Sequence, residues 1–228
     1  MENDFGYISE NLRIIRENAA EAMDKYRRDN DLRIMAVTKT VAPDAINFAV
    51  SHGIDLLGEN RVQEYQSKAD MYDKSAEVHF IGHLQTNKVK YIIAPMTMIQ
   101  SVDSLKLAQE ISRLAVNNNK TMDILCEINI GGEESKSGVS PDSAQELLEQ
   151  ITELEGVNLR GLMTIPPPSE SDIFLGRMKE LYDCLSEKFG FDTLSMGMTH
   201  DYVQAIRNGS NIVRIGTGLF GARDYSKK

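Results

Sequence analysis

A lysine at the end of an apolar segment is the residue of this chain best placed to do chemistry. Lys39 follows the run Ile34–Thr38, which is typical of a buried strand, so its amine is predicted to lie in the mouth of whatever the strands enclose. An amine withdrawn from water can act as a nucleophile toward a carbonyl group. Most strand-end lysines simply reach solvent, so this interpretation depends on what other segments bring to the same place.

Two later segments end in glycine-bearing tips of the kind that hold phosphate. The first tip contains Met198 and Thr199, and Thr199 is predicted to cap the following helix, with its hydroxyl and adjacent amides facing an anion. In the second tip, Gly216 lets the backbone approach a ligand closely and Thr217 adds a hydroxyl. Either loop alone is typical of an ordinary turn. Together with Lys39, the pair favours a Schiff-base site for a phosphorylated aldehyde.

An arginine inside an apolar strand adds a third feature. Arg214 lies between Val213 and Ile215, and a buried guanidinium needs a partner. One interpretation is an internal salt bridge with Glu127, which alternates with isoleucines and is expected, with Asn129, to point inward. The other is a donor to a ring nitrogen of a cofactor. Because arginine keeps its proton, it would leave a pyridine nitrogen unprotonated and the ring a weaker electron sink.

The elements that must position these residues alternate between short apolar strands and helical stretches. Strands are predicted to begin near Ile34, Asp55, Val78, Met98, Ile124, Leu159, Thr193 and Asn211. Helices are predicted over residues 43–51, 61–72, 87–93, 104–117, 141–154, 172–189 and 200–208, with Ser140 as one cap and Gly209 ending the last of them. A further helix within residues 1–30 is expected to pack outside the fold, because Ile8, Leu12, Ile15, Ala19, Met23 and Tyr26 recur at helical spacing.

Alternating strands and helices imply a parallel sheet. Eight units in about 200 residues fit a closed (β/α)8 TIM barrel at its lower size limit, in which every strand's C-terminal end faces the same side and builds the active site. The structural alternative is an open doubly wound sheet, but no G-x-G-x-x-G turn follows the first strand. No linker divides the chain, so residues 1–228 are expected to form a single domain.

Composition excludes several classes of protein. The 228 residues are 41% hydrophobic and 26% charged, and the formal net charge of −9 argues against a nucleic-acid or anionic-membrane surface. Any bound phosphate must therefore be held by local donors. Cys126 and Cys184 have no metal-type spacing, so we expect no metal site and a reducing, cytoplasmic location. No segment resembles a membrane span or a secretory signal, and we expect a monomer.

The order of these motifs resembles the pyridoxal phosphate homeostasis family, also called the YggS/PROSC family, which is related to the N-terminal barrel of bacterial alanine racemases. The resemblance extends from about residue 32 to residue 225. The matching stretches are residues 36–39, 58–64, 79–88, 127–130, 134–138, 160–166, 195–199, 213–217 and 220–223. So many matches in order are highly specific.

The resemblance implies a barrel that binds pyridoxal 5′-phosphate (PLP) as an imine on Lys39. It also implies that Arg214 faces the pyridine nitrogen and that Asn60 and Met198 line the pocket. The phosphate would lie on the loops bearing Thr199, Gly216 and Thr217. Thr199 stands where the family usually has serine, which keeps the hydroxyl. His200 stands where a small or acidic residue is common, which changes the electrostatics expected at that helix start.

Other polar residues carry weaker interpretations. His83, at a strand tip, is a candidate pocket-lining residue, whereas His79 alternates with Phe80 and is interpreted as a satisfied core histidine. The Glu134–Gly138 segment looks like a mobile loop near the mouth, although a solvated loop is equally compatible with its composition.

The resemblance implies a protein that takes part in intracellular PLP homeostasis without robust turnover, with PLP-dependent apo-enzymes as candidate acceptors. The alternative is a PLP-dependent racemase. Barrel racemases of this kind add a C-terminal β-domain and a tyrosine from a partner subunit, whereas this sequence stops at Lys228, soon after the eighth expected strand. A cofactor-free Schiff-base aldolase is a third hypothesis, but it has no use for an arginine facing a ring.

Overall fold

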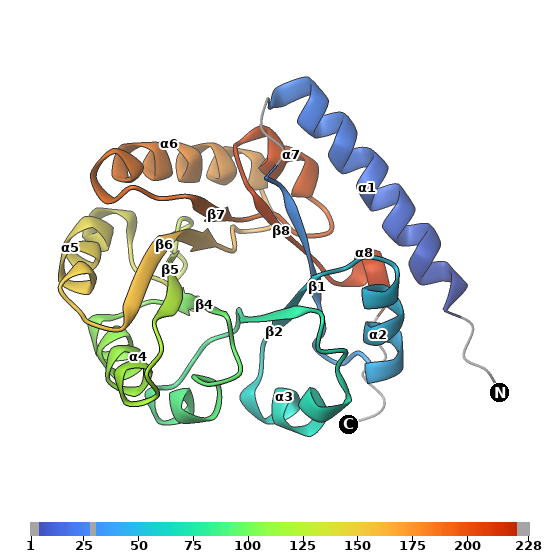
Figure 1. Ribbon diagram of the computed structural model, residues 1–228. Helices are drawn as coiled ribbons and strands as arrows, with labels where there is room; N and C mark the ends of the chain where they lie inside the picture. The colour runs from blue at the N-terminus through green and yellow to red at the C-terminus, as the bar shows by residue number, and fades with distance from the viewer. Residues whose placement is uncertain (1–4, 28–30, 223–228) are drawn as a thin grey trace.

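Eight parallel strands close into one barrel in the computed structural model, which describes residues 5–27 and 31–222 (Figure 1). The strands are β1 (Arg33–Val37), β2 (Leu56–Glu59), β3 (Glu77–Phe80), β4 (Met98–Val102), β5 (Met122–Ile128), β6 (Val157–Thr164), β7 (Thr193–Ser195) and β8 (Ile212–Ile215). Each strand pairs with the next, and β8 pairs with β1 through Ile215 and Ala36. The predicted (β/α)8 barrel is therefore confirmed, and this closure excludes the open sheet.

The predicted strand starts all lie within two residues of the observed ones. The helices are α1 (Gly6–Tyr26), α2 (Pro43–Ser51), α3 (Val62–Lys68), α4 (Leu105–Asn117), α5 (Pro141–Thr152), α6 (Ser171–Phe189), α7 (Tyr202–Arg207) and α8 (Thr217–Phe220). Two 3-10 helices, Ala69–Met71 and Thr86–Tyr91, replace α-helix expected in 61–72 and 87–93. The helix expected from residue 200 begins only at Tyr202, and α8 was not predicted.

Sequence signals explain where several helices begin and which face they bury. Ser140 caps α5 by accepting a hydrogen bond from the Ser143 amide at 3.3 Å, and Pro141 follows at the first helical position. On α4 the buried residues include Leu107, Ile111 and Ala115, a spacing that forms one apolar stripe. These stripes cover the outside of the barrel, so the strands are buried on both faces.

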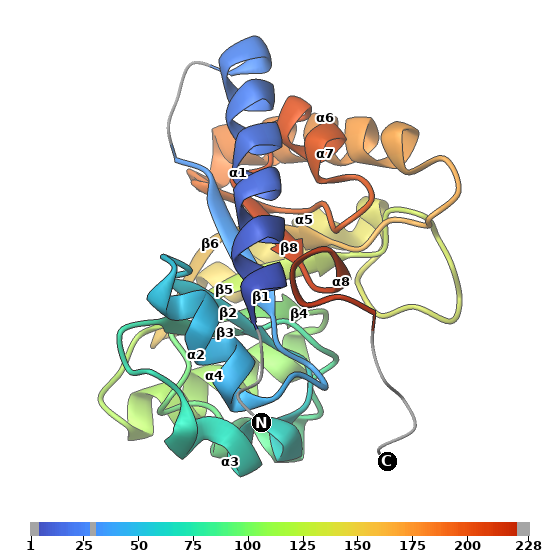
Figure 2. The ribbon, with the colours of Figure 1, turned by 90° about the vertical axis from the view of Figure 1, so that its right-hand side faces the viewer.

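The N-terminal helix lies outside the barrel, as predicted, across the side where β8 meets β1 (Figures 1 and 2). Its buried stripe comprises Ile8, Leu12, Ile15, Ala19 and Ala22. Asn11 donates to the Leu219 carbonyl at 3.0 Å, and Asn18 donates to the Tyr202 hydroxyl at 2.9 Å. The helix therefore supports α7 and α8, which follow the two predicted phosphate loops. Residues 1–4, 28–30 and 223–225, which belong to predicted or matching segments, lie outside the described residues.

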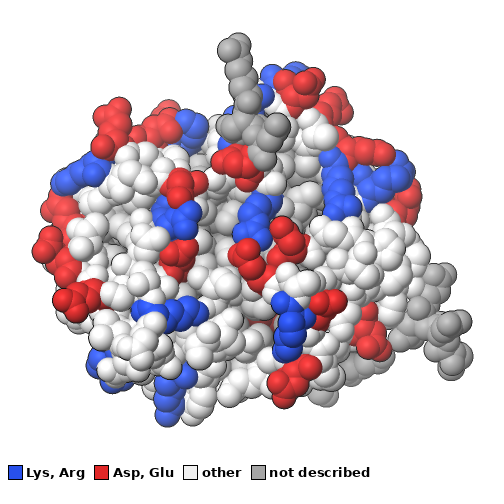
Figure 3. Space-filling model, in the orientation of Figure 1, with Lys and Arg blue, Asp and Glu red and all other residues white. Residues whose placement is uncertain are grey.

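On the face seen in Figure 3, lysine and arginine side chains lie beside aspartate and glutamate side chains in small mixed groups. None of the helices described in 5–27 and 31–222 is both long enough and apolar enough to cross a membrane.

Candidate cofactor site

A cavity of about 220 Å³ opens at the upper end of the barrel, which we define as the end where the strands finish. It is lined by Val37, Lys39, Asn60, Ile81, Ile165, Met198, Thr199, His200, Arg214, Gly216 and Thr217. All seven residues predicted to hold a cofactor thus line one cavity, although they come from β1, β2, β7, β8 and the loops after them. They converge because parallel strands in a closed barrel all finish at the same end.

Lys39 lies in a turn rather than directly at the strand end, because β1 stops at Val37. The next residue, Thr40, has a left-handed backbone with φ of 64°, which is unfavourable for a β-branched residue. Its amide donates to Glu64 Oε1 at 2.5 Å. Lys68 Nζ donates to the Thr38 carbonyl at 3.0 Å, to the Val41 carbonyl at 3.3 Å and to Glu64 Oε1 at 2.8 Å. The turn is therefore held by a buried lysine and its carboxylate partner.

A buried carboxyl group supports the same turn from below. Glu59, at the end of β2, accepts hydrogen bonds from the Thr38 hydroxyl at 2.7 Å and from the Tyr72 hydroxyl. Burial raises the pKa of Glu59, and hydrogen bonding from Tyr72 and the charge of Lys68 oppose that shift. Sequence reasoning assigned no individual role to Glu59, Glu64 or Lys68, although Glu59 and Glu64 belong to the matching stretch 58–64.

Replacing Lys68 with methionine is expected to lower the free energy of unfolding by about 2–4 kcal/mol. The change leaves two carbonyls and a carboxylate without their shared donor. Urea unfolding of this variant beside Lys106→Met, an exposed lysine on α4, measures the difference. Equal losses in the two variants would show that Lys68 does not hold the turn.

The two loops predicted to bind phosphate lie side by side. Thr199 Oγ1 accepts from the Gly218 amide at 3.1 Å and from the Thr217 hydroxyl at 3.4 Å, so the hydrogen of Thr199 is left for another acceptor. The approach is close, since a Cβ atom on Gly218 would stand 2.8 Å from Thr199 Cγ2. The amides of Thr199, His200, Gly216 and Thr217 have no acceptor among the described residues.

The predicted capping role of Thr199 is wrong. Helix α7 begins at Tyr202, and Asp201 is the residue before it. Asp201 Oδ1 accepts from the Met198 amide at 2.7 Å, which tightens the loop after β7 into a turn. Thr199 contacts the neighbouring loop instead. The sequence alone does not show which of two nearby amides will donate to a hydroxyl residue that lies close to a helix start.

Arg214 lies at the floor of this cavity, 3% exposed. Its Nη1 donates to Ser195 Oγ and its Nη2 donates to the Thr164 carbonyl, both at 2.7 Å. These contacts take the place of the internal salt bridge with Glu127, one of the two interpretations of Arg214, because no ion pair joins Glu127 and Arg214. Burial lowers the pKa of Arg214 to about 10, while the charge of Glu127 opposes the shift. The guanidinium therefore remains charged at neutral pH.

A second cavity of about 260 Å³ adjoins the first and shares Asn60, Ile81 and Ile165 with it. Its other lining residues are Gly82, His83, Glu127, Ile128, Asn129, Lys136 and Ser137. His83 thus lines a pocket, as predicted, and Glu127 and Asn129 both face the interior. The 134–138 loop lies at this mouth, with Ser137 Oγ 3.1 Å from His83 Nδ1. Asn60 Oδ1 is buried without a hydrogen-bond partner among the described residues, so the shared wall offers an unused acceptor.

Glu127 is a buried carboxyl group that titrates near neutrality. Burial and the neighbouring charge of Asp103 raise its pKa to about 7, against a smaller opposing effect of Arg214. The pKa is raised in the folded state, so stability from this group is fully present below about pH 4.5 and is lost as the pH rises through 7. The loss approaches about 3 kcal/mol at pH 8.

Replacing Glu127 with glutamine, which cannot ionise, is therefore expected to stabilise the protein by about 2–3 kcal/mol at pH 8 relative to its effect at pH 5. Thermal or urea unfolding at both pH values measures this difference. Glu146→Gln, on the exposed side of α5, serves as the matched control. A pH-independent effect of Glu127→Gln would mean that the carboxyl is not titrating between these values.

Comparison with known proteins agrees with this geometry. Residues 11–224 match the family described as alanine racemase, N-terminal domain. A pyridoxal phosphate homeostasis protein of Aquifex aeolicus (strain VF5) is 42% identical over 95% of this chain and 98% of its own length. The protein of the same name from Escherichia coli (strain K12) is 35% identical over 97% of this chain and 99% of its own length. The chain belongs to the pyridoxal phosphate homeostasis protein family.

Solved structures extend the comparison beyond sequence. PipY of Synechococcus elongatus PCC7942, solved with PLP bound, superposes on this family member with a TM-score of 0.81 at 28% identity, covering 94% of this chain and all of PipY. An alanine racemase of Clostridium difficile 630 superposes with a TM-score of 0.73 at 19% identity, over 95% of this chain and 58% of the racemase. The second likeness shows a shared fold alone.

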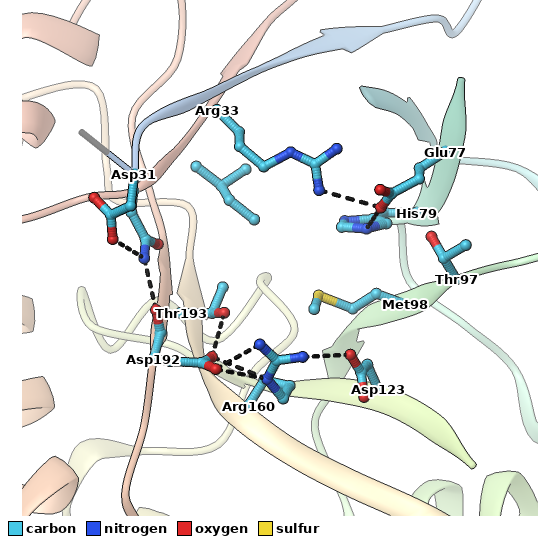
Figure 4. Close-up of a pocket in the computed structure, with 12 residues that line it drawn as sticks. Asp31, Arg33, Glu77, His79, Thr97, Met98, Asp123, Arg160, Asp192 and Thr193 are labelled. Carbon is cyan, nitrogen blue, oxygen red and sulfur yellow. Dashed lines mark hydrogen bonds and ion pairs between the residues drawn. The ribbon is translucent and has the colours of Figure 1, made fainter. Parts of the chain in front are cut away.

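This member of the pyridoxal phosphate homeostasis protein family also has a larger cavity, of about 490 Å³, at the lower end where the strands begin (Figure 4). Sequence reasoning missed it. Most of its charged residues are paired with one another: Arg160 with Asp123 at 2.7 Å and Asp192 at 2.5 Å, and Arg33 with Glu77 at 3.1 Å. The upper cavity, where the amides of Thr199, His200, Gly216 and Thr217 have no acceptor among the described residues, is the better candidate for a cofactor site.

Proposed function

We propose that this chain binds PLP in the upper cavity and takes part in intracellular PLP homeostasis without robust catalytic turnover. Membership of the family supports the role, and a relative has been solved with PLP bound. The observation that carries the proposal is the convergence of Lys39, Arg214 and the Thr199 and Thr217 loops on one cavity.

The donors of the cavity fit the three parts of PLP. Hydroxyls and amides at Thr199, Gly216 and Thr217 suit a phosphate, because these amides have no acceptor within residues 5–27 and 31–222. Arg214 would face the pyridine nitrogen and, still charged at neutral pH, would leave that nitrogen unprotonated. Lys39 would supply the amine for a Schiff base. The net charge of −9 makes these local donors essential, since the overall field repels a phosphate.

The remaining predicted residues shape the site. Asn60 and Met198 would form walls beside the ring, and Asn60 Oδ1 offers a buried acceptor that has no donor in the described part of the chain. When bound, PLP supplies an aldehyde that an amine can capture and a ring that can withdraw electrons. An arginine rather than an acid beside the ring nitrogen weakens that withdrawal, which supports holding and handing on the cofactor over turnover. We further propose a cytoplasmic monomer that passes PLP to apo-enzymes.

An absorption spectrum of the purified protein with added PLP tests the proposal. We expect a yellow band that borohydride removes, and little racemisation of D- or L-alanine. A band accompanied by steady turnover of about 1–1,000 per second would favour the racemase hypothesis. A protein that binds PLP without the band would contradict the Schiff base, and one that neither forms the band nor binds PLP would favour a cofactor-free aldolase.

A further inference from the structure

A chain of hydrogen bonds crosses the inside of the barrel from the lower cavity to Arg214. Arg214 Nη1 donates to Ser195 Oγ at 2.7 Å, and the Ser195 hydroxyl donates to Gln100 Oε1 at 2.7 Å. Gln100 Nε2 then lies 2.9 Å from His79 Nδ1. His79 lines the lower cavity, whereas Arg214 lines the upper one. Strands β3, β4, β7 and β8 each contribute one residue, so the chain links the two ends of the barrel.

Burial makes each of these contacts hard to replace. Gln100 and Ser195 are fully buried, and His79 is 2% exposed. No water-facing alternative is open to their polar atoms, and an unmade hydrogen bond inside a protein costs more than a made one contributes. A buried polar network that is fully satisfied tends to select a single arrangement of its side chains.

The chain of hydrogen bonds also has a direction. Gln100 presents its oxygen to Ser195 and its amino group to His79, so Nδ1 of His79 accepts and the proton of the ring is on Nε2. Because Ser195 gives its proton to Gln100, the serine lone pairs are available to Arg214. Reversing the Gln100 amide would place its amino group against Ser195 and leave Nδ1 of His79 facing an oxygen.

Groups at the lower cavity favour the observed direction. His79 Nε2 lies 3.7 Å from Glu77 Oε2, and Glu77 is paired with Arg33 at 3.1 Å (Figure 4). A nearby carboxylate favours a proton on Nε2, which frees Nδ1 to accept. Burial and the charge of Arg33 lower the pKa of His79 to about 3, so the imidazole is neutral in ordinary buffers.

We propose that Ser195 and Gln100 are positioning residues that fix the direction of the Arg214 guanidinium, and that His79 orients them from the opposite end of the barrel. The inference rests on the proposed function, in which Arg214 faces the ring of PLP. Arg214 has a second anchor, because its Nη2 donates to the Thr164 carbonyl. With Nη2 held there, the contact of Nη1 with Ser195 sets the orientation of the rest of the guanidinium group. The cofactor's electronic environment is thereby tied to residues that never touch it.

The ligand-free protein gives the first test, by nitrogen-15 NMR of the arginine and histidine side chains. In wild type we expect separate Nη1 and Nη2 signals for Arg214 and a neutral Nε2–H form of His79. Ser195→Ala should merge or shift the Arg214 signals, because Nη1 loses its acceptor. Ser101→Ala is the matched control: it removes an equally buried hydroxyl on β4 that has no partner in the described residues. Unchanged Arg214 signals in Ser195→Ala would overturn the role of Ser195.

The contact between Gln100 and His79 is tested by Gln100→Glu. This change keeps the oxygen that accepts from Ser195 but removes the amino group that donates to His79. We expect the proton of His79 to appear on Nδ1 while the Arg214 signals stay separate. An unchanged histidine tautomer would overturn the role of Gln100. If Ser195→Ala does not fold, Ser195→Cys keeps a side chain of similar size with a much weaker hydrogen-bonding group.

PLP titration gives the third test. Ser195→Ala leaves Thr199 and Thr217 intact, so we expect binding to be retained while the absorption maximum of bound PLP shifts and its pH titration changes. Ser101→Ala should reproduce the wild-type spectrum. An identical spectrum in Ser195→Ala, despite a reoriented Arg214, would overturn the link to the ring. Failure of the wild type to bind PLP would instead contradict the proposed function. The NMR measurements would still decide whether the chain of hydrogen bonds positions Arg214.

Discussion

Replacing Lys39 with alanine is expected to abolish covalent trapping of PLP by borohydride while leaving measurable non-covalent binding. Lys39 would supply the only Schiff-base amine within the 220 Å³ cavity, since no other lysine lines it among the described residues. The phosphate donors at Thr199 and Thr217 are untouched by the change, and they should supply much of the affinity. Mass spectrometry of digested, reduced wild type should locate the adduct on Lys39.

Two other lysines make the assignment falsifiable. Lys136 lines the adjoining cavity, and Lys88 lines a smaller one, of about 140 Å³, that shares His83 with it. Lys136→Ala and Lys88→Ala should each keep the adduct on Lys39. A sole adduct on Lys136 or Lys88 in the wild type, or full trapping in Lys39→Ala, would show that the reactive amine is elsewhere.

The double variant Thr199→Ala/Thr217→Ala is expected to lose most of the preference for PLP over pyridoxal. With PLP bound, the Thr217 hydroxyl would exchange its 3.4 Å hydrogen bond to Thr199 for one to the phosphate. Each hydroxyl that donates to a charged phosphate is worth about 1.5–3 kcal/mol. Two of them correspond to about a hundredfold to ten-thousandfold in affinity, since about 1.4 kcal/mol is a tenfold change. Pyridoxal has no phosphate, so its affinity should change little. Titration of wild type and variant with both vitamers gives the ratio directly.

A matched double variant checks that the loss is local. Thr121→Ala/Thr152→Ala removes two exposed threonines that line neither the 220 Å³ cavity nor the adjoining 260 Å³ one. This variant should keep the wild-type preference for PLP over pyridoxal. Equal affinity of the wild type for PLP and pyridoxal would mean that the loops after β7 and β8 are structural turns and hold no phosphate.

The fold was largely predictable because its signals are local. Alternation of apolar runs with helical spacing placed all eight strands within two residues, and Ser140 with Pro141 marked the start of α5. Elements whose form depends on neighbours were predicted less well. Residues 86–91 form a 3-10 helix, and α8, only four residues long, has too little sequence for a periodic pattern.

The sequence by itself determined which residues share the upper end of the barrel. Lys39, Asn60, Thr199 and Gly216 follow four different strands, and parallel strands in a closed barrel must finish together. That argument needs only the order of elements, so it survives errors of one or two residues in their bounds. It also predicted that Arg214 would be buried, since its neighbours in the strand are apolar.

Only the tertiary structure decided which polar atoms meet. Arg214 finds Ser195 rather than Glu127, Thr199 meets Gly218 rather than capping α7, and Lys68 crosses to the Lys39 turn. The residues in these pairs lie 19 to 30 positions apart in the chain. Their contacts depend on strand register and side-chain rotamer, because a shift of about 1 Å between donor and acceptor is enough to break a hydrogen bond. Patterns along a sequence report burial and period, but they contain no such distances.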